Sequence, residues 1–588
     1  MQSDAEKLKG DVHIPTKDMF SRIYRYLKPE MGKFVGAMTL ILFNVVLDII
    51  LPLFVSQITN NLKSDGINVD FIVGMAVAYL AIGVFNQAFL VWESMLLQKA
   101  GQNIIYTLRN DVFSHIEQLS QNQFDEMPVG SLVTRVASYT ASMSDLFTNV
   151  IVNVIKNVLT VVGVYGIMLY ISWQLSLVML AFIVVVFITS FVFRNVVKKV
   201  FTKERQYISD LNTFLNENLS GMKLIQIFNR QQKKELEFLE KNENLRKSRY
   251  KVVLAFGIYR PFITLLYISS IAVTFWLGME FGLDAGMIVA FYLYLSRFFN
   301  PIQNLADQLN NLQKAITASE RLFNLLDVKP EIRDREDAVT VDKFDGKIEF
   351  KNVWFAYKGE DWILKDVSFT INPKETCAFV GATGAGKTTI LSLIVRNYEI
   401  QKGQILIDGR DISTIDIHSL RKGIGQMLQD VFLFSGTVRS NITLNDESFG
   451  DEEIEAACKY VNADTFISAQ EHGLDEEVIE RGENFSQGQR QLLSFARTVL
   501  HKPQILILDE ATANIDTETE VVIQKSLENI RNIGTMLVVA HRLSTIQHAD
   551  QIIVLQNGRI IEKGTHQQLL KNKGYYHKLY ELQFENRD

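Results

Sequence analysis

The chain has 588 residues, too many for one ordinary domain, and 47% of them are hydrophobic. A net charge of −6 and a pI near 6.0 exclude a general basic surface for nucleic acid, and we expect no nucleic-acid partner. The two cysteines, Cys377 and Cys458, exclude a disulfide framework, and neither has a neighbour that could share a metal ion.

The N-terminal segment changes from polar to amphipathic after residue 19. Residues 1–19 are polar and predict a tail without a core of its own. From Phe20 to Lys28, aromatic and basic residues recur at helical spacing before Pro29. This pattern predicts a short helix on the cytoplasmic surface of a membrane, with an ordinary surface helix as the alternative.

The region from residue 20 to 305 is dominated by long apolar stretches. Each is long enough to cross a bilayer, which takes about 20 helical residues. The predicted spans are Phe34–Ile58, Phe71–Leu97, Val150–Tyr170, Leu175–Phe193, Val252–Leu277 and Ala285–Leu305. The three candidate outer loops together contain one basic residue, Lys63, whereas Lys and Arg flank the other ends of the spans. We therefore predict a multi-pass protein of the cell membrane with both termini in the cytoplasm.

The two long connections on the cytoplasmic side differ from the outer loops. Residues 98–149 and 194–251 are polar, carry apolar residues at helical period, and contain few glycines and prolines. This composition predicts that the membrane helices continue well beyond the bilayer. Interruptions at Phe124–Gly130 and around Ser220–Lys223 predict short tips that contact a soluble domain, although they could also be simple turns.

The C-terminal half follows a different pattern. Residues 306–345 predict a helical extension and a charged linker. From residue 346 to 577, short apolar strands alternate with helices, which predicts an α/β domain on a mainly parallel sheet. Residues 578–588 form a polar C-terminal tail.

A glycine-rich loop follows the first buried strand of this domain. Gly381–Thr388 fits the pattern G-x-x-x-x-G-K-[ST] and comes directly after the apolar run Cys377–Val380. Such a loop turns its backbone N–H groups inward, and with the next helix it forms a cradle for phosphates. Lys387 could then reach the β/γ-phosphates, and Thr388 could offer its hydroxyl to Mg²⁺. A purely structural glycine turn is the alternative.

Two later strands end in side chains that suit the same site. The run Ile505–Leu508 is followed by Asp509 and Glu510. Asp509 fits the Mg²⁺-holding acid of P-loop enzymes, and Glu510 could orient the attacking water. His541 follows the strand Met536–Ala540, where a γ-phosphate contact is expected, although a lone histidine after a strand is usually structural.

A second possible phosphate nest precedes another helix. Ser486-Gln487-Gly488-Gln489 is a small polar turn at the start of the predicted helix Gln489–Leu500. One chain with one nucleotide has no use for two nests. Two chains packed head to tail would use both.

Taken together, these motifs resemble one half of an ATP-binding cassette (ABC) exporter. The resemblance covers nearly the whole chain and implies a type IV exporter-like transmembrane domain of six helices fused to an α/β P-loop ABC nucleotide-binding domain. It implies a nucleotide site formed by Tyr357, Gly381, Ala382, Thr383, Gly384, Ala385, Gly386, Lys387, Thr388 and Thr389. Tyr357 would stack on the base, so that ATP is expected and GTP is not excluded.

The same resemblance assigns the remaining motifs. It implies catalytic roles for Gln429, Glu510 and His541, Mg²⁺ ligation by Thr388, Gln429 and Asp509, and a D-loop that ends at Asp516. Ser486, Gln487, Gly488 and Gln489 occupy the signature segment that acts on the partner's nucleotide. Glu480–Gly482 lies in the segment that contacts the tips of the membrane domain.

The signature segment departs from the family pattern. The family has Leu-Ser-Gly-Gly-Gln, whereas this chain has Phe485-Ser486-Gln487-Gly488-Gln489. Gln487 replaces a glycine where the backbone must approach the opposing γ-phosphate, and this costs backbone freedom. Asn514 in the D-loop also departs from the usual alanine or leucine. The pattern predicts a non-identical partner half, although a homodimer that tolerates Gln487 is the alternative.

The resemblance implies ATP-driven export of hydrophobic or amphipathic compounds by alternating access. A homodimeric lipid or peptide exporter is the alternative, and a nucleotide-gated channel is a weaker one. Asp48 lies inside the first span, where an ionisable residue suggests contact with a cationic or zwitterionic substrate or a position at the hydrated boundary. Lys156 and Arg297 are further charges within spans that could pair or line a cavity.

Overall fold

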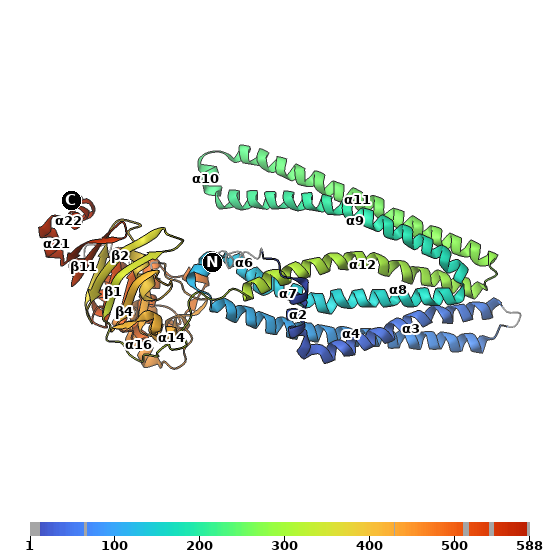
Figure 1. Cartoon of the computed structure of the whole chain (residues 1–588), viewed down its shortest axis with the longest axis horizontal. Coiled ribbons are helices and arrows are strands. Elements are labelled where there is room, and N and C mark those ends of the chain that lie inside the picture. Colours follow the sequence, from blue (N-terminus) through green and yellow to red (C-terminus); the bar gives the residue numbers. More distant parts are fainter. Residues whose placement is uncertain (1–11, 64–66, 429, 510–516, 540–545, 585–588) are drawn as a thin grey trace. The chain divides into compact units, whose positions relative to one another are not determined.

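The structure is a computed structural model that describes residues 12–63, 67–428, 430–509, 517–539 and 546–584 (Figure 1). The chain forms two compact units. The first comprises Met1–Ile116 and Val129–Val328, and the second comprises Glu117–Pro128 and Lys329–Asp588. The second unit therefore includes a short piece of the chain that lies between two membrane helices in the sequence.

The described part of the first unit consists of helices and the turns between them. In chain order they are α2 (Thr16–Leu27), η1 (Lys28–Glu30), α3 (Met31–Lys63), α4 (Val69–Glu117), α6 (Val129–Thr134), η2 (Arg135–Tyr139), α7 (Thr140–Asp145), η3 (Leu146–Ile151), α8 (Val152–Ile171), α9 (Trp173–Ser220), α10 (Met222–Ile227), α11 (Gln231–Glu280) and α12 (Ala285–Leu326). The segments η2 and η3 are π-helical, a rare conformation that the sequence pattern did not predict.

The amphipathic helix expected near the N-terminus is α2. Met19, Ile23 and Leu27 recur at helical spacing and are buried, whereas Phe20 and Tyr24 are exposed. Polar contacts also hold this helix to the end of α12, since Arg22 Nη1 donates to both carboxylate oxygens of Asp327 at 2.7 Å.

Among the described helices, five are long and apolar enough to cross a membrane. They are Lys17–Lys63, Val69–Glu117, Val129–Ile171, Trp173–Ser220 and Gln231–Glu280. The sixth predicted span lies in α12, which is not in this set because polar residues such as Arg297 and Asn300 interrupt its apolar sequence. The helix is nevertheless central, since it packs against α3 and α8 and buries Phe291 and Tyr294 completely.

The membrane helices continue far beyond the predicted spans. The helix α4 extends from the predicted end at Leu97 to Glu117, and α9 extends to Ser220. The helices α9 and α11 run side by side and are joined at one end by the short helix α10 (Figure 1). This arrangement confirms the predicted long hairpin with an interruption around Ser220–Lys223.

The described part of the second unit contains a six-stranded, a four-stranded and a two-stranded sheet, the last formed by β7 and β8. The strands are β1 (Ile348–Ala356), β2 (Trp362–Ile371), β3 (Thr376–Val380), β4 (Lys402–Ile407), β5 (Arg410–Asp411), β6 (Ile424–Met427), β7 (Gly436–Thr437), β8 (Glu477–Val478), β9 (Ile505–Asp509), β10 (Thr535–Val539), β11 (Gln551–Gln556) and β12 (Arg559–Gly564). The six-stranded order is β12-β11-β3-β10-β9-β6, and each pair is parallel except β12 with β11. The mainly parallel sheet is as predicted.

Helices accompany these strands through the rest of the unit. They are α5 (Gln121–Asp125), α13 (Lys387–Ile394), η4 (Ile412–Thr414), α14 (Ile417–Lys422), α15 (Val438–Thr443), α16 (Asp451–Tyr460), α17 (Asp464–Ser468), η5 (Gly473–Asp475), η6 (Glu480–Gly482), α18 (Gln487–Leu500), α19 (Thr517–Ile530), α21 (His566–Asn572) and α22 (Tyr575–Phe584). The last helix continues past residue 577, where the sequence predicted the start of the tail.

The strand β3 is buried on both faces, as its continuous apolar sequence predicts. Ala378 and Val380 pack into one hydrophobic core, whereas Cys377 and Phe379 pack into the core on the opposite side of the sheet. Both cores therefore fix the carboxyl end of β3, where the glycine-rich loop begins.

Candidate functional site

The glycine-rich loop needs glycine at specific positions. Gly386 has a φ of 100°, in the left-handed region, and an added Cβ would lie 2.6 Å from Leu364 Cδ2. An added Cβ at Gly381 would lie 2.3 Å from the carbonyl oxygen of Leu555. These two positions allow the loop to turn sharply between β3 and the first residue of α13, which is Lys387.

Lys387 is buried and bends back over the loop. Its Nζ donates to the carbonyl oxygens of Gly381 at 2.8 Å and Ala382 at 3.2 Å. The ammonium group is therefore held at the start of the loop. A phosphate in the loop would lie within reach of this charge, as the motif predicts.

The structure brings two predicted Mg²⁺ ligands together. Thr388 Oγ1 donates to Asp509 Oδ1 at 3.4 Å, although 121 positions separate the two residues in the sequence. Asp509 ends β9, and it reaches the loop because the carboxyl ends of parallel strands share one edge of the sheet. A hydroxyl and a carboxylate are hard oxygen donors, and Mg²⁺ is commonly held by one or two carboxylates plus substrate phosphates.

Several predicted site residues lie outside the described part of the chain. They are Gln429, Glu510, His541 and the D-loop residues 513–516, including Asp516. Their strands are described, and Asp509, which precedes Glu510, pairs with Val539 near the end of the neighbouring strand. The catalytic roles of Gln429, Glu510 and His541 stay predictions.

Tyr357 presents an aromatic ring beside the loop. Its side chain is 41% exposed, and its hydroxyl lies 3.0 Å from Thr389 Oγ1 on α13. Phe355 and Tyr398 contact the ring edge-to-face at centroid distances of 4.9 and 5.1 Å. These contacts leave part of the ring accessible for stacking. Sequence reasoning missed Tyr398, because an isolated tyrosine after a helix carries no motif.

The signature segment begins α18 with a regular capping box. Ser486 Oγ accepts from the backbone N–H of Gln489 at 3.2 Å, and the Gln489 side chain accepts from the N–H of Ser486 at 2.9 Å. Neither Gln487 nor Gly488 has a positive φ. Gln487 therefore does not strain the backbone of this chain, contrary to the expectation from the sequence. What Gln487 changes is the side chain that it adds to the signature segment.

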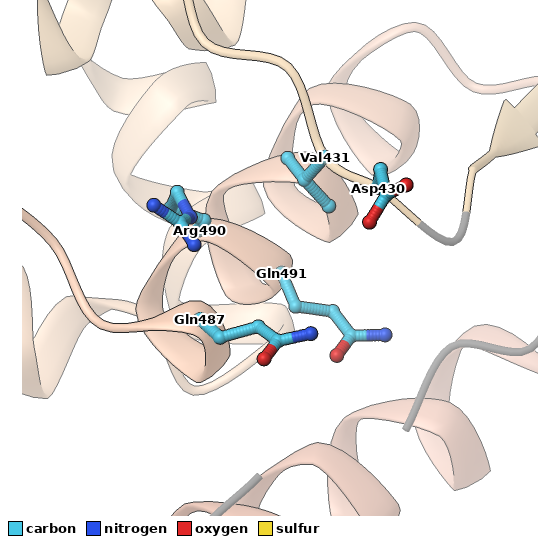
Figure 2. A pocket seen from close by; sticks show the side chains of 5 residues that line it. All are labelled: Asp430, Val431, Gln487, Arg490 and Gln491. Carbon is cyan, nitrogen blue, oxygen red and sulfur yellow. The ribbon is translucent and has the colours of Figure 1, made fainter. Parts of the chain in front are cut away.

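That side chain lines a small cavity of about 70 Å³ (Figure 2). The other lining residues are Asp430, Val431, Arg490 and Gln491. Figure 2 shows the amides of Gln487 and Gln491 extending in the same direction, whereas Arg490 points away from them. Gln487 thus fills space beside the segment that follows Gln429.

The first predicted tip belongs to the nucleotide-binding unit. The tip helix α5 is held by Gln123 Nε2, which donates to the carbonyl oxygen of Lys329 at 2.9 Å. Tyr398 donates its hydroxyl to Asp125 Oδ2 at 3.1 Å, and burial beside Asp125 raises the pKa of Tyr398. Lys358 Nζ lies 3.6 Å from Glu126 Oε1. These bonds confirm that the tip contacts the soluble domain, beside the predicted base-stacking Tyr357.

The second tip is exposed, and in the segment predicted to contact the tips Glu480 and Arg481 are exposed whereas Gly482 is buried. Leu224, Ile227 and Phe228 at the tip formed by α10 are each more than 60% exposed, at 62, 65 and 64%. Glu480–Gly482 forms η6 directly before the signature. Both remain predicted contact points for other parts of an assembly.

The charges predicted inside the membrane spans are paired. Asp48 Oδ1 accepts from Asn86 Nδ2 at 3.0 Å and lies 3.5 Å from Arg297 Nη1. Lys156 Nζ lies 3.8 Å from Glu93 Oε2. Asn86 and Glu93 escaped the sequence reasoning, because single polar residues in an apolar stretch carry no pairing signal.

Comparison with known proteins agrees with this architecture. Residues 34–302 match the family description "ABC transporter transmembrane region", and residues 364–513 match "ABC transporter". The "Multidrug resistance-like ATP-binding protein MdlB" of Buchnera aphidicola subsp. Schizaphis graminum is 33% identical over 97% of this chain and 98% of its own length. An "ATP-dependent lipid A-core flippase" of Syntrophus aciditrophicus is 32% identical over 97% of this chain and 95% of its own length.

A solved structure supports the same assignment. "Structure of a bacterial Atm1-family ABC exporter with ATP bound" aligns with a TM-score of 0.78 and 25% sequence identity, over 96% of this chain and 99% of that chain. The predicted fold class is thereby confirmed. The chain belongs to the ABC transporters, as an exporter-type ATPase in which a helical multi-pass membrane domain is fused to an ATP-binding domain.

Proposed function

We propose that this chain is one half of a heterodimeric exporter that uses ATP to move hydrophobic or amphipathic compounds, including drugs, out of the cytoplasm or the inner leaflet. Both termini lie in the cytoplasm, where ATP is available, as the scarcity of basic residues in the candidate outer loops indicates. The relative named as multidrug resistance-like supports the substrate class.

The residues of the first site have distinct tasks in this proposal. Thr388 and Asp509 hold Mg²⁺ with help from Gln429, and the ion offsets negative charge on the phosphates. Lys387 adds a fixed positive charge, and Tyr357 stacks on the base. Tyr357 accepts any purine face, so GTP is a second candidate nucleotide.

Hydrolysis then depends on two residues that follow adjacent strands. Glu510 orients and polarises the attacking water, and His541 contacts the γ-phosphate. Asp509 pairs with Val539, so the described ends of β9 and β10, which precede these two residues in the sequence, lie side by side. Glu510 is the residue on which turnover depends most directly.

The observation that carries the heterodimer is Gln487 in the first turn of α18. In a head-to-tail dimer the signature of one chain covers the nucleotide of the other. Gln487 adds a side chain where the family has none, so this chain's signature makes a weaker site. Its own Walker residues are complete, which suggests that the partner supplies the regular signature.

A homodimeric lipid exporter is the second candidate, and the relative named as a lipid A-core flippase favours it. Purification of the tagged full-length chain from its own cells distinguishes the two. A second, non-identical half in equal amount supports the heterodimer. Recovery of this chain alone as an active dimer would instead support the homodimer.

The variant Glu510→Gln tests the catalytic assignment in the same assembly. We expect basal ATP hydrolysis to fall by about 100-fold or more, the usual size for removal of a general base, while ATP binding survives. Full activity in this variant would refute the role of Glu510. Currents that depend on nucleotide but survive this substitution would indicate a channel.

A further inference from the structure

Polar side chains inside the apolar part of the first unit form two clusters. The Glu93 cluster consists of Asn44 on α3, Glu93 on α4 and Lys156 on α8, and the Asp48 cluster consists of Asp48 on α3, Asn86 on α4 and Arg297 on α12. Each cluster therefore contains one carboxylate, one amide and one basic group.

The two clusters lie along one seam between α3 and α4. Asn44 and Asp48 are one helical turn apart on α3, and Asn86 and Glu93 are two turns apart on α4. Asn44 bonds to Glu93 and Asp48 bonds to Asn86, so the two helices run antiparallel. The clusters thus share chemistry and helices but occupy different depths.

The Glu93 cluster is closed. Asn44 is 2% exposed and Glu93 is 7% exposed. Asn44 Nδ2 donates to Glu93 Oε2 at 3.2 Å, and Lys156 lies 3.8 Å from the same oxygen. Asn44 Oδ1 is likewise buried with no partner among the described residues. The burial of the Glu93 carboxylate is therefore what separates this cluster from the Asp48 cluster.

The Asp48 cluster is open by comparison. The side chain of Asp48 is 42% exposed, and that of Arg297 is 28% exposed. Arg297 Nη1 lies 3.5 Å from Asp48 Oδ1, nearer than Lys156 lies to Glu93 at 3.8 Å, so exposure of the carboxylate is what distinguishes the two clusters. Charged groups inside a membrane avoid lipid and face the protein interior or a hydrated path. The open side of Asp48 is therefore suited to meet a solute.

Two hydrogen-bond acceptors near this carboxylate lack their usual donors. Asn86 uses its Nδ2 on Asp48, and its Oδ1 is buried with no partner among the described residues. Pro52 lies one turn after Asp48 in α3 and has no N–H, so the backbone carbonyl of Asp48 lacks its helical donor. Tyr294 donates to the next carbonyl, that of Ile49, at 2.6 Å.

We propose that the Asp48 cluster binds the protonated amino group of amphipathic amines. The Asp48 carboxylate is the counter-ion, and Asn86 Oδ1 and the Asp48 carbonyl accept the ammonium N–H bonds. Arg297, whose side chain is 28% exposed, neutralises Asp48 when no cation is bound and gives way when one binds. This assignment deepens the proposed export function and rests on it.

Three probes with the same tail separate the contributions. Decylammonium carries charge and N–H donors, decyltrimethylammonium carries charge only, and decanol carries neither charge nor an ammonium donor. Binding is measured by equilibrium dialysis to the full chain in nanodiscs, in the assembly in which it is purified, and partition into empty nanodiscs is subtracted. No ATP is present, so failure of binding and failure of export are distinguishable.

In the unmodified protein we expect decylammonium to bind about tenfold more tightly than decanol, the effect of one hydrogen-bonded charge contact, with decyltrimethylammonium between them. The double variant Asp48→Asn with Arg297→Gln keeps the site neutral and should bring the three affinities together. Asn86→Leu should remove only the advantage of decylammonium over decyltrimethylammonium.

The matched control is Glu93→Gln in the closed cluster, which should leave the ratios between probes unchanged. Equal affinities for all three probes in the unmodified protein would overturn the proposal. So would a Glu93→Gln effect as large as that of the double variant. Because Asn86→Leu leaves both charges in place, it tests the site even where the double variant does not fold.

Discussion

The bond between Tyr398 and the tip helix α5 allows a sharp test of how nucleotide binding reaches the membrane domain. Tyr398→Phe removes one hydroxyl, which donates to Asp125 Oδ2 at 3.1 Å. The ring contacts with Tyr357 and Phe355, at 5.1 and 5.7 Å between centroids, do not need this hydroxyl. The variant therefore changes the link to the tip and leaves the predicted base-stacking surface in place.

The magnitude follows from the type of contact. A hydrogen bond to a charged acceptor at a partly exposed site contributes about 1 kcal/mol, which corresponds to a change of about fivefold. The neighbouring ion pair is weaker, because Lys358 is 79% exposed and lies 3.6 Å from Glu126. Such exposed pairs contribute about 0–1 kcal/mol. Tyr398→Phe should therefore have the larger effect, and Lys358→Met is its matched control.

The assay is the ratio of substrate-stimulated to basal ATP hydrolysis in proteoliposomes. We expect Tyr398→Phe to reduce this ratio about fivefold while the affinity for ATP stays near that of the unmodified protein. Combined with Asp125→Asn, it should cause little further loss, because both changes remove the same bond. The reasoning would be refuted if the losses in this ratio from Tyr398→Phe and Asp125→Asn were additive in the double variant. It would also be refuted if Lys358→Met reduced the ratio more than Tyr398→Phe does.

Three further predictions follow from the nucleotide-binding unit. Gly386→Ala should abolish ATP binding and destabilise the protein by about 2–4 kcal/mol in thermal unfolding, because it adds a steric clash to a left-handed φ. Gly409→Ala shares the positive φ without a nearby atom and should cost only about 1–2 kcal/mol. Burial raises the pKa of the Cys458 thiol to about 12, so at pH 8 it is protonated and should resist iodoacetamide until the protein unfolds. Chelation of Mg²⁺ should weaken ATP binding in the unmodified protein but have little further effect in Asp509→Asn, as isothermal titration can show.

Sequence patterns predicted the parts of this structure that depend on local chemistry. The apolar run at Cys377–Val380 predicts a strand buried on both faces, and the glycines after it predict a sharp turn into a helix. Both features are present, since the side chains of β3 pack alternately into two cores and Gly386 has a φ of 100° directly before α13. Thr388 and Asp509 met as predicted for a related reason, since parallel strands deliver their ends to one edge.

Features that depend on distant contacts escaped prediction. The π-helical segments η2 and η3 carry no sequence signal that predicts their wider turns, and η3 packs closely against α4. Gly101 shows this packing, since an added Cβ would lie 2.5 Å from Thr148 Cγ2 in η3. Tyr398 was missed for the same reason, because its partner Asp125 is 273 positions away in the sequence.

The sixth span shows why composition alone underestimates a membrane helix at the centre of a bundle. Lipid-facing helices must be apolar around their surface, but α12 packs against α3 and α8 and can carry polar groups toward them. Arg297 finds Asp48, and Tyr294 donates to the carbonyl of Ile49. Arg297 and Tyr294, which lower the hydropathy of α12, thus also join it to α3. Because Arg297 pairs with the partly exposed Asp48, these polar groups make α12 a candidate for substrate contact even though they lower its mean hydropathy.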